Sequence, residues 1–223
     1  MKPFELIGET LSADGTVIKL VSRNAEYFIL ADGAPLMSSR MHGSEDALAT
    51  FACERFRNHP RPSVLIGGLG MGFTLRATLD LLSANSTVVV SELLPAVVDW
   101  NRGPLGPLAG DPLKDRRVRL AIEDVNLTLR SNPGVFDAVL LDVDNGPAEF
   151  TVANNAALYD SAGLAGARAA LKKDGVLAIW AAHEDEKFAK RLRQSGFDVQ
   201  VRRIRAHANK KGSRHTIFLG YKT

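Results

Sequence analysis

Four glycines crowd one short stretch of the chain, VLIGGLGMGFTLR at residues 64–76, where they occupy positions Gly67, Gly68, Gly70 and Gly72. Each glycine costs conformational entropy when the chain folds, so this concentration indicates that another group must approach the backbone closely. The apolar run before the glycines reads as a strand, and the residues after them read as a helix. A glycine-rich turn in that setting suits a ligand that lies against the backbone at a helix N-terminus.

An acidic residue closes the next apolar run, TVVVSE, at Glu92, which lies twenty residues after Gly72. At this spacing a carboxylate accepts hydrogen bonds from both hydroxyls of a ribose in nucleoside-binding α/β folds. Each signal alone is weak, since a tight turn and a solvated glutamate would explain them separately. Together they point to an adenosine-containing cofactor.

The spacing of the glycines selects among such cofactors. Counted from Gly68, the dinucleotide fingerprint G-x-G-x-x-G would place its last glycine at Phe73, which argues against NAD or FAD. The sequence contains no G-x-x-x-x-G-K-[ST], so we do not expect a P-loop nucleotide site. G-x-G-x-G followed by a strand-end acid is the pattern of class I S-adenosylmethionine-dependent transferases. It predicts that Gly68, Gly70, Gly72 and Glu92 bind S-adenosylmethionine or its decarboxylated form.

Two further acids follow the apolar run AVLLD, at Asp142 and Asp144. Carboxylates at the end of a buried strand are costly unless a cation lies between them, so they indicate a reaction centre that handles positive charge. We expect Asp142 to act as a base and Asp144, the second catalytic candidate, to be a partner for an ammonium group. Glu45 and Asp46, at the start of an earlier helical stretch, are further partners for an ammonium group.

The elements that must position these residues alternate along the chain from about residue 63. Short apolar runs separated by helical stretches predict βαβ units and a mostly parallel sheet. The strand-like runs are SVLIGG, TVVVSE, RVRLAI, DAVLLDV and GVLAIWA, and the helical stretches include FTLRATLDLL, AVVDWN, GLAGARAALKK and EKFAKRLRQS. In an open parallel sheet, ligands bind at the carboxyl ends of the strands where the strand order reverses. The glycines and the acids are expected to meet there.

Both ends of the chain depart from this alternation. Residues 5–36 read as short strands with turn signals at Asp14-Gly15 and Asp32-Gly33, which predicts a small antiparallel unit. Near the C-terminus, FDVQVRRIRA and RHTIFLGYK are joined only by HANKKGS, too short for a parallel crossover, so an antiparallel hairpin is expected. We therefore predict an α/β chain with a Rossmann-like class I methyltransferase sheet, preceded by the β unit. The predicted domains are residues 1–40, the small β unit, and residues 41–223, the cofactor-binding domain.

Composition excludes several classes of protein. The 223 residues are 45% hydrophobic and 24% charged, which is ordinary for a globular chain. Cys53 is the single cysteine, so we expect no disulfide framework, no metal site and a reducing, cytoplasmic setting. No stretch approaches the roughly 20 apolar residues of a membrane helix, and the N-terminus has no signal-peptide pattern. The formal charge of +3, with no aromatic residues among the basic ones of the last quarter, makes a nucleic-acid partner unexpected.

Five motifs in order make the sequence resemble the spermidine synthase family of aminopropyltransferases, over nearly the whole chain from about Asp32. They are GLGMGFTLR, SELLPAVVD, RVRLAIEDVNLTLR, FDAVLLDVDNGPAEF and ALKKDGVLAIW. Enzymes of that family carry a small N-terminal β unit before the cofactor domain, which also suits residues 5–36. The order of the five motifs is more specific than any one of them.

The resemblance assigns roles to individual residues. It implies that Glu92 holds the ribose, that Asp124 accepts a hydrogen bond from the adenine amino group with Val125 beside it, and that Asp142 lies at the reaction centre. Judged from spacing alone, Asp124 is equally well placed to cap the helical stretch VNLTLR, and that alternative stays open.

Three departures from the family's pattern bear on the substrates. The family's glycine loop has an aspartate that touches the amine end of decarboxylated S-adenosylmethionine, and this position is Met71 here. The segment DVDNGP is shorter than the family's catalytic segment, and its acids are two apart rather than three. The family's Tyr-His pair, which contacts the diamine, has no counterpart in SEDALATFA.

The sequence thus predicts a spermidine synthase-like transferase that alkylates a small amine-type acceptor, with Asp142 as base. A methyltransferase acting on a small molecule is the alternative, because ordinary S-adenosylmethionine carries a carboxylate that suits a helix N-terminus and does not need the acid that Met71 replaces. A third reading is a non-catalytic domain that binds an adenosyl ligand. A homodimer is left open.

Overall fold

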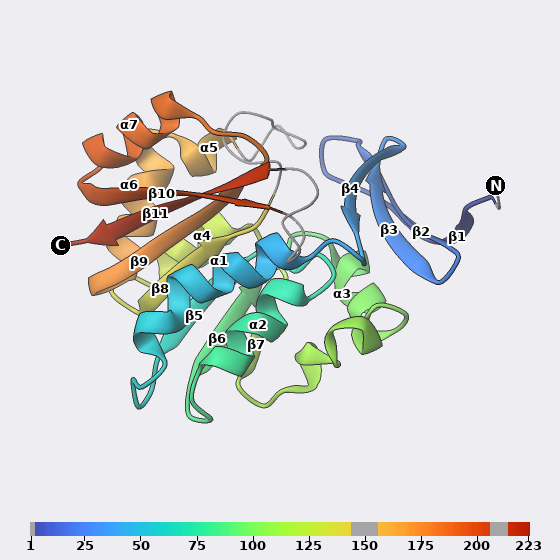
Figure 1. Ribbon diagram of the computed structural model, residues 1–223, viewed down its shortest axis with the longest axis horizontal. Helices are drawn as coiled ribbons and strands as arrows, with labels where there is room; N and C mark the ends of the chain where they lie inside the picture. The colour runs from blue at the N-terminus through green and yellow to red at the C-terminus, as the bar shows by residue number, and fades with distance from the viewer. Residues whose placement is uncertain (1–2, 144–155, 206–213) are drawn as a thin grey trace.

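The structure is a computed structural model that describes residues 3–143, 156–205 and 214–223 (Figure 1). Its strands form a four-stranded and a seven-stranded sheet. The four-stranded sheet contains β1 (Glu5–Leu11), β2 (Val17–Arg23), β3 (Glu26–Ala31) and β4 (Ala34–Ser38). The seven-stranded sheet contains β5 (Ser63–Gly67), β6 (Thr87–Ser91), β7 (Val118–Ala121), β8 (Phe136–Leu141), β9 (Leu171–Ala181), β10 (Phe197–Arg205) and β11 (Arg214–Lys222).

The helices follow the predicted alternation with the strands of the large sheet. They are α1 (Gly43–Cys53), α2 (Phe73–Leu81), α3 (Pro95–Arg102), α4 (Val125–Ser131), α5 (Ala156–Tyr159), α6 (Ser161–Ala170) and α7 (Glu186–Gln194). Short 3₁₀ turns are η1 (Glu54–Phe56), η2 (Gly106–Ala109) and η3 (Pro112–Lys114). Several starts have a recognisable cause: the Asp160 and Asp185 side chains accept hydrogen bonds from the first backbone N–H groups of α6 and α7.

The large sheet has the strand order β10-β11-β9-β8-β5-β6-β7. β5 pairs in parallel with β6 and β8, as do β6 with β7 and β8 with β9, whereas β11 pairs antiparallel with β9 and β10. The predicted fold class is confirmed: a Rossmann-like, mostly parallel sheet closed by an antiparallel hairpin and preceded by a small antiparallel sheet. The division into domains at residue 40 stays a prediction.

Two apolar cores lie on opposite faces of the large sheet. Along β5, Val64 and Ile66 belong to the core under α1, α2 and α3, whereas Leu65 belongs to the core under α4, α6 and α7. This alternation follows from the two-residue period of a strand that is covered on both faces. Figure 1 shows α1 and α2 on one side of the sheet and α6 and α7 on the other.

The small sheet packs against the same core as α1 and α3. Ile18, Leu20 and Ile29 from β2 and β3 are buried in the cluster that also contains Trp100 of α3. Gly8 of β1 lies so close to this indole that a Cβ atom there would come within 2.5 Å of the ring nitrogen Nε1 of Trp100. The small sheet is therefore fixed at the carboxyl-end edge of the large one, where it can contribute to a site.

One helix ends earlier than its sequence suggests. The stretch GLAGARAALKK reads as helical through Lys173, but α6 ends at Ala170 and β9 begins at Leu171. Leu171 pairs with Phe136 of β8, and the register of the two strands then shifts before Ala138 pairs with Val176, with Asp174 in between at a φ of +62°. Strand pairing outweighs the helical propensity of the two lysines.

An ion pair ties the start of β8 to its neighbours. Asp137 is only 6% exposed, and its Oδ2 accepts hydrogen bonds from the Ser63 backbone N–H and from Lys172 Nζ, both at 2.7 Å. Asp137→Ala should lower the free energy of unfolding by about 2–3 kcal/mol, because both donors lose a buried partner. Urea denaturation measures this. Glu54→Ala, which removes the exposed Arg57–Glu54 pair, should leave the midpoint near that of the wild type, and an equal effect of the two substitutions would contradict the account.

Among the described residues, no helix combines the length and the hydrophobicity needed to cross a membrane.

Candidate functional site

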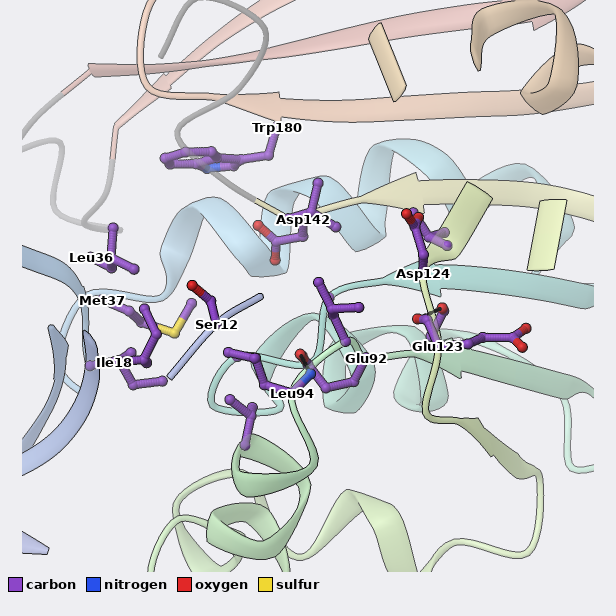
Figure 2. Close-up of a pocket in the computed structure, with 18 of the residues that line it drawn as sticks. Ser12, Ile18, Leu36, Met37, Glu92, Leu94, Glu123, Asp124, Asp142 and Trp180 are labelled. Atoms are coloured by element: carbon purple, nitrogen blue, oxygen red, sulfur yellow. Dashed lines mark hydrogen bonds between the residues drawn. The ribbon is translucent and has the colours of Figure 1, made fainter. Parts of the chain in front are cut away.

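A pocket lies where the strand order of the large sheet reverses, at the carboxyl ends of β5, β6, β7 and β8 (Figure 2). The small sheet, α1 and the end of β9 complete its wall. The lining residues are Ser12, Ile18, Ile29, Leu36, Met37, Glu45, Gly68, Gly70, Ser91, Glu92, Leu93, Leu94, Val97, Glu123, Asp124, Val125, Asp142, Val143 and Trp180. The predicted meeting point of the glycine loop and the strand-end acids is thus where the pocket forms.

Gly68 brings the loop after β5 against the end of β8. Its φ is +89°, a left-handed conformation that side chains rarely adopt, and a Cβ atom there would overlap the Asp142 carbonyl oxygen. Its backbone N–H donates to the Ser91 carbonyl at 2.8 Å, which ties the loop to β6 as well. Only glycine meets both demands at this position.

The other two predicted loop glycines differ in their surroundings. Gly70 lines the pocket, and a Cβ atom there would come within 3.0 Å of Met37 Cε in β4. Gly72 does not line it: it has a φ of +83°, precedes α2 directly and faces the Asn101 side chain. A direct contact between Gly72 and a ligand therefore has no support in the pocket lining, and its role is to turn the chain into α2.

Glu92 is buried at the end of β6, 8% exposed, with its carboxylate held by the glycine loop. One oxygen accepts from the Leu69 backbone N–H and the other from the Leu94 backbone N–H, each at 2.9 Å. Burial raises the pKa of Glu92, and these backbone hydrogen bonds oppose the rise. Because these backbone N–H groups already donate to the Glu92 carboxylate, they are not available to bind a phosphate group.

The acids after β7 occupy the neighbouring part of the pocket. Asp124 caps α4, because its Oδ1 accepts from the Asn126 backbone N–H at 2.8 Å. It also lines the pocket, and its contact with adenine stays a prediction. Val125, next to it, is a buried lining residue. Sequence reasoning missed Glu123, whose Oε1 accepts from Thr128 Oγ1 at 2.7 Å.

Asp142 lies at the centre of the pocket in Figure 2, directly after β8. Thr74 in the first turn of α2 is 3% exposed and donates from Oγ1 to Asp142 Oδ2 at 2.6 Å. Burial raises the pKa of the Asp142 carboxyl, and the Thr74 hydrogen bond opposes the rise. Asp144, the second predicted catalytic residue, lies outside the described residues.

Glu45 in the first turn of α1 adds a carboxylate beside Asp142. It is 6% exposed, lines the pocket and accepts from Ser44 Oγ at 2.6 Å. Burial, together with the negative charge of Asp142, raises the pKa of Glu45 to about 7. The adjacent Asp46 points elsewhere: it pairs with His42 at 3.0 Å and does not line the pocket.

The charge of the pocket has one sign in the part of the chain that the structure describes. Five carboxyl groups line it, and no lysine, arginine or histidine does; the five are Glu45, Glu92, Glu123, Asp124 and Asp142. Within these same residues, no three His, Cys, Asp or Glu side chains are arranged to hold a metal ion. Such a pocket stabilises a ligand that carries positive charge.

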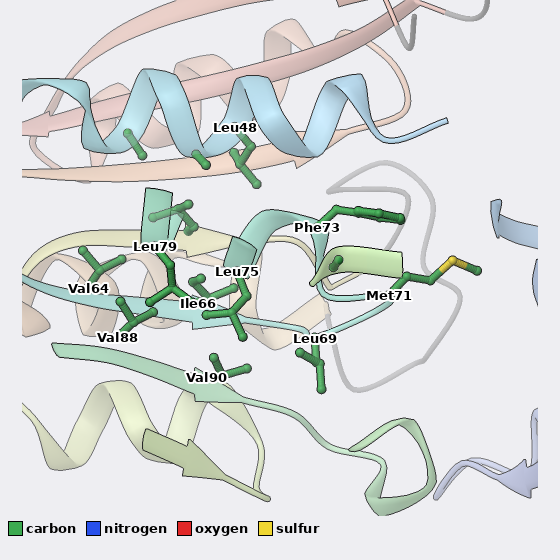
Figure 3. Packing of buried hydrophobic residues seen from close by; sticks show 14 of the residues in the cluster. Leu48, Val64, Ile66, Leu69, Met71, Phe73, Leu75, Leu79, Val88 and Val90 are labelled. Carbon is green, nitrogen blue, oxygen red and sulfur yellow. The ribbon is translucent and has the colours of Figure 1, made fainter. Parts of the chain in front are cut away.

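Met71 makes no contribution to this charge. It is fully buried in the apolar cluster that contains Leu69 and Phe73 (Figure 3), and it does not line the pocket. Trp180, near the end of β9, packs against the apolar cluster and also lies over the pocket (Figure 2).

The carboxyl pair makes stability depend on pH. Because the pKa of Glu45 rises from its ordinary value of 4.5 to about 7 on folding, the native state holds a proton that the unfolded state has lost in that range. The contribution of Glu45 to the free energy of unfolding is therefore fully present below pH 4.5 and is lost as the pH rises through about 7. Asp142 and Asp46 are the charged groups that raise this pKa.

Glu45→Gln should remove this pH dependence in the unliganded protein. From about pH 5 to about pH 8, the thermal midpoint of the wild type should fall relative to that of the variant. Asp46→Asn, a change at the half-exposed neighbour that makes the smallest contribution to this pKa, should keep most of the wild-type slope. Parallel curves for wild type and Glu45→Gln would show that Glu45 is not protonated in the folded protein.

Comparison with known proteins identifies the family. Residues 43–201 match the family model described as spermine/spermidine synthase domain. The chain belongs to the spermine/spermidine synthase family. Polyamine aminopropyltransferase 2 of Pseudomonas aeruginosa is 32% identical over 171 residues, which is 74% of this chain and 46% of that protein. The polyamine aminopropyltransferase of Leptospira biflexa is 35% identical over 127 residues, 56% of this chain and 42% of that protein.

Solved spermidine synthases share the fold of this family member. A spermidine synthase in complex with the transition state analogue AdoDATO has a TM-score of 0.74 at 18% identity, covering 98% of this chain and 72% of that one. The spermidine synthase of Thermotoga maritima has the same TM-score at 19% identity, covering 98% of this chain and 73% of that one. The matched part of the chain spans less than half the length of these two curated relatives.

Proposed function

We propose that this chain transfers an aminopropyl group from decarboxylated S-adenosylmethionine to a small amine. The observation that carries the proposal is the charge of the pocket, whose described lining holds five carboxyl groups and no cationic side chain. The donor brings a sulfonium and an ammonium, and the acceptor brings an amine, so every charged group of the reactants would be positive. A donor that kept its carboxylate would add a like charge to an acidic pocket, at an energetic cost.

The residues at the carboxyl ends of β5, β6 and β7 fit the adenosyl part of such a donor. Gly68 and Gly70 line the pocket with backbone atoms alone, against which the ligand would lie. The Glu92 carboxylate lines the pocket and is held there by backbone N–H groups that include those of Leu69 and Leu94, and it would accept from the ribose hydroxyls. Asp124 and Val125, on the same side of the pocket, would take the adenine.

The transfer is a displacement at carbon. The lone pair of the acceptor amine forms the new C–N bond at the methylene next to the sulfonium, the C–S bond breaks, and its electron pair neutralises sulfur to give methylthioadenosine. The attacking amine must first lose its ammonium proton, and the new secondary ammonium is stabilised by nearby carboxylates. Asp142 would accept that proton, since it lies at the centre of the pocket and is oriented by Thr74.

Glu45 would support Asp142 in this step. A carboxyl with a pKa of about 7 is suited to exchange a proton with an amine near neutral pH, because a base works best when its pKa is close to the operating pH. A bound ammonium would also relieve the repulsion between Glu45 and Asp142 and favour ionisation of both groups.

A methyltransferase is the second candidate, and Met71 is the observation that favours it. This side chain is buried in the core and leaves the glycine loop without an acid of its own. Ordinary S-adenosylmethionine would place its carboxylate near that loop. In-line placement of the acceptor would suffice for methyl transfer, with Asp142 again as base.

Mass spectrometry of the products tests the proposal. The purified protein is incubated with a panel of small amines and, in separate reactions, with decarboxylated S-adenosylmethionine or S-adenosylmethionine. We expect methylthioadenosine and an amine that has gained one aminopropyl group, only with the decarboxylated donor. Formation of S-adenosylhomocysteine and a methylated product would favour the methyltransferase. Ligand binding with no product from either donor would favour a non-catalytic adenosyl-binding domain.

A further inference from the structure

Thr74 does not line the pocket, but its side chain contacts the proposed base, Asp142. We propose that Thr74 is a positioning residue for the transfer: its hydroxyl holds the Asp142 carboxylate in the orientation, and in the ionised state, in which it accepts the proton of the amine. The inference rests on the proposed function, because it names the residue that prepares the base of that same transfer.

The Thr74 hydroxyl has a distant partner for a helical threonine. In a helix, a threonine hydroxyl can donate to a backbone carbonyl one turn earlier. Thr74 instead donates from Oγ1 to Asp142 Oδ2 at 2.6 Å, across 68 positions of the chain. Two heavy atoms on Cβ restrict the χ1 angle of a threonine, and Thr74 is only 3% exposed, so its surroundings restrict it further. The direction of this hydroxyl is therefore fixed before a ligand binds.

Among the described residues, the Thr74 hydroxyl is the one hydrogen-bond donor to the Asp142 carboxylate. The Glu92 carboxylate, by contrast, accepts from backbone N–H groups that include those of Leu69 and Leu94. A hydrogen bond donated to a carboxylate favours its charged form. Loss of Thr74 Oγ1 would therefore leave the charged form of Asp142 without a donor in the described part of the chain.

The charged side chains that line the pocket with Asp142 oppose its ionisation, because each of them is an acid. They are Glu45 of α1, Glu92 after β6, and Glu123 and Asp124 after β7. Burial raises the pKa of Asp142 as well, and the Thr74 hydrogen bond opposes the rise. Before an ammonium binds, the Thr74 hydroxyl is thus the described group that favours an Asp142 able to accept a proton.

The segment that holds Asp142 is the one that contains the glycine loop. Thr74 lies two residues after Gly72, in the first turn of α2. A Cβ atom at Gly68 would overlap the Asp142 carbonyl oxygen, and the Asp142 backbone N–H donates to the Gly67 carbonyl at 2.9 Å. Residues 67–74 therefore contact both the backbone and the side chain of Asp142. The position of the base is set by the segment against which the adenosyl group would lie.

Titration of the Asp142 carboxyl by ¹³C NMR tests this inference without turnover. With labelled aspartate side chains, the Asp142 signal is assigned by its absence in Asp142→Asn. In Thr74→Val, we expect Asp142 to ionise about one to two pH units higher than in the wild type, because the hydrogen bond that favours the carboxylate is lost. Thr74→Ser, which keeps the hydroxyl, should titrate within about 0.5 pH unit of the wild type. If Thr74→Val does not fold, Thr74→Ala carries the same expectation.

The pH profile of aminopropyl transfer is the second readout. Because the base must be ionised, loss of the Thr74 hydroxyl should move the acidic limb of kcat/KM to higher pH. At about pH 6, kcat/KM of Thr74→Val should be at least about tenfold below that of the wild type, and the difference should narrow as the pH rises. A merely structural defect would instead lower kcat/KM by the same factor at every pH.

Thr78→Val is the matched control. Thr78 lies one turn later in α2 and is fully buried, and its hydroxyl donates to no carboxyl group of the described residues. This variant should keep the wild-type titration of Asp142 and the wild-type pH profile. An unchanged Asp142 titration in Thr74→Val, or an equal displacement in Thr78→Val or Thr74→Ser, would overturn the inference.

The two proposals fail in different ways. If the wild type aminopropylates no amine but Thr74→Val displaces the Asp142 titration, the proposed function fails, and the control of the Asp142 charge by Thr74 is supported. If the wild type aminopropylates amines and Thr74→Val keeps its titration and pH profile, the proposed function stands and the role of Thr74 is wrong.

Discussion

Replacing Asp142 with asparagine is expected to lower kcat/KM for aminopropyl transfer by about 10²- to 10⁴-fold, the usual loss when a general base is removed. The amide keeps an oxygen that can accept the Thr74 hydrogen bond, so the local geometry should persist. What is lost is the proton acceptor at the centre of the acidic pocket. Steady-state kinetics with the decarboxylated donor measure the effect.

Binding of methylthioadenosine separates chemistry from folding in this variant. This product carries no ammonium and no sulfonium charge, so its affinity should change by less than about threefold in Asp142→Asn. Asp46→Asn, a matched change at a carboxylate outside the pocket, should keep the activity of the wild type. Full activity of Asp142→Asn would exclude Asp142 as the base and direct attention to Glu45.

Gly68→Ala is expected to abolish binding of adenosyl ligands, with affinity reduced at least about 100-fold. The alanine would have to adopt a φ near the +89° of the glycine, and its Cβ would overlap the Asp142 carbonyl oxygen, so the loop or the end of β8 must move. Positive-φ strain alone costs about 1–3 kcal/mol, and the overlap adds to the destabilisation. Calorimetry and thermal denaturation report the two effects.

Gly15→Ala is the matched control. Gly15 has nearly the same φ, +88°, but a Cβ atom there meets nothing within 4 Å. This variant should show the strain cost without the overlap and should bind methylthioadenosine as the wild type does. If Gly68→Ala and Gly15→Ala had the same affinity for methylthioadenosine, the close approach of the loop to Asp142 would not matter for ligand binding.

The sequence predicted the parts of the fold that follow from local pattern. The parallel alternation, the start of α2 at Phe73 and the C-terminal hairpin all rest on apolar periodicity and loop length. Local pattern failed at the turn between β2 and β3, where Asn24 and Ala25 have φ values of 52° and 60°. Asn24 favours a turn, but Ala25 does not, so strand pairing has to hold the alanine at a positive φ.

Only those site residues that directly follow a strand of the parallel sheet could be predicted from the sequence. Glu92, Asp124 and Asp142 each follow a strand of the parallel sheet, and the topology brings them into one pocket. The roles predicted for them stay predictions. Sequence reasoning offered Glu45 and Asp46 equally as ammonium partners, and the orientation of α1 is what brings Glu45 alone into the pocket.

The apolar wall of the pocket has no signature in the sequence. Ile18, Ile29, Leu36 and Met37 read as ordinary strand residues of a small sheet. Their exposure to the pocket depends on how that sheet packs against α3, through contacts such as that of Gly8 with Trp100. Long-range packing of this kind leaves no local pattern. The homodimer, likewise, stays a prediction.

Calorimetric comparison of decarboxylated S-adenosylmethionine with S-adenosylmethionine tests the central claim most directly, because the two ligands differ only in the carboxylate. Methylthioadenosine and S-adenosylhomocysteine serve as uncharged-sulfur references. We expect the decarboxylated donor to bind at least about tenfold more tightly, since the described pocket lining offers carboxylates and no cation to the extra negative charge. Equal or tighter binding of S-adenosylmethionine would contradict it and favour methyl transfer.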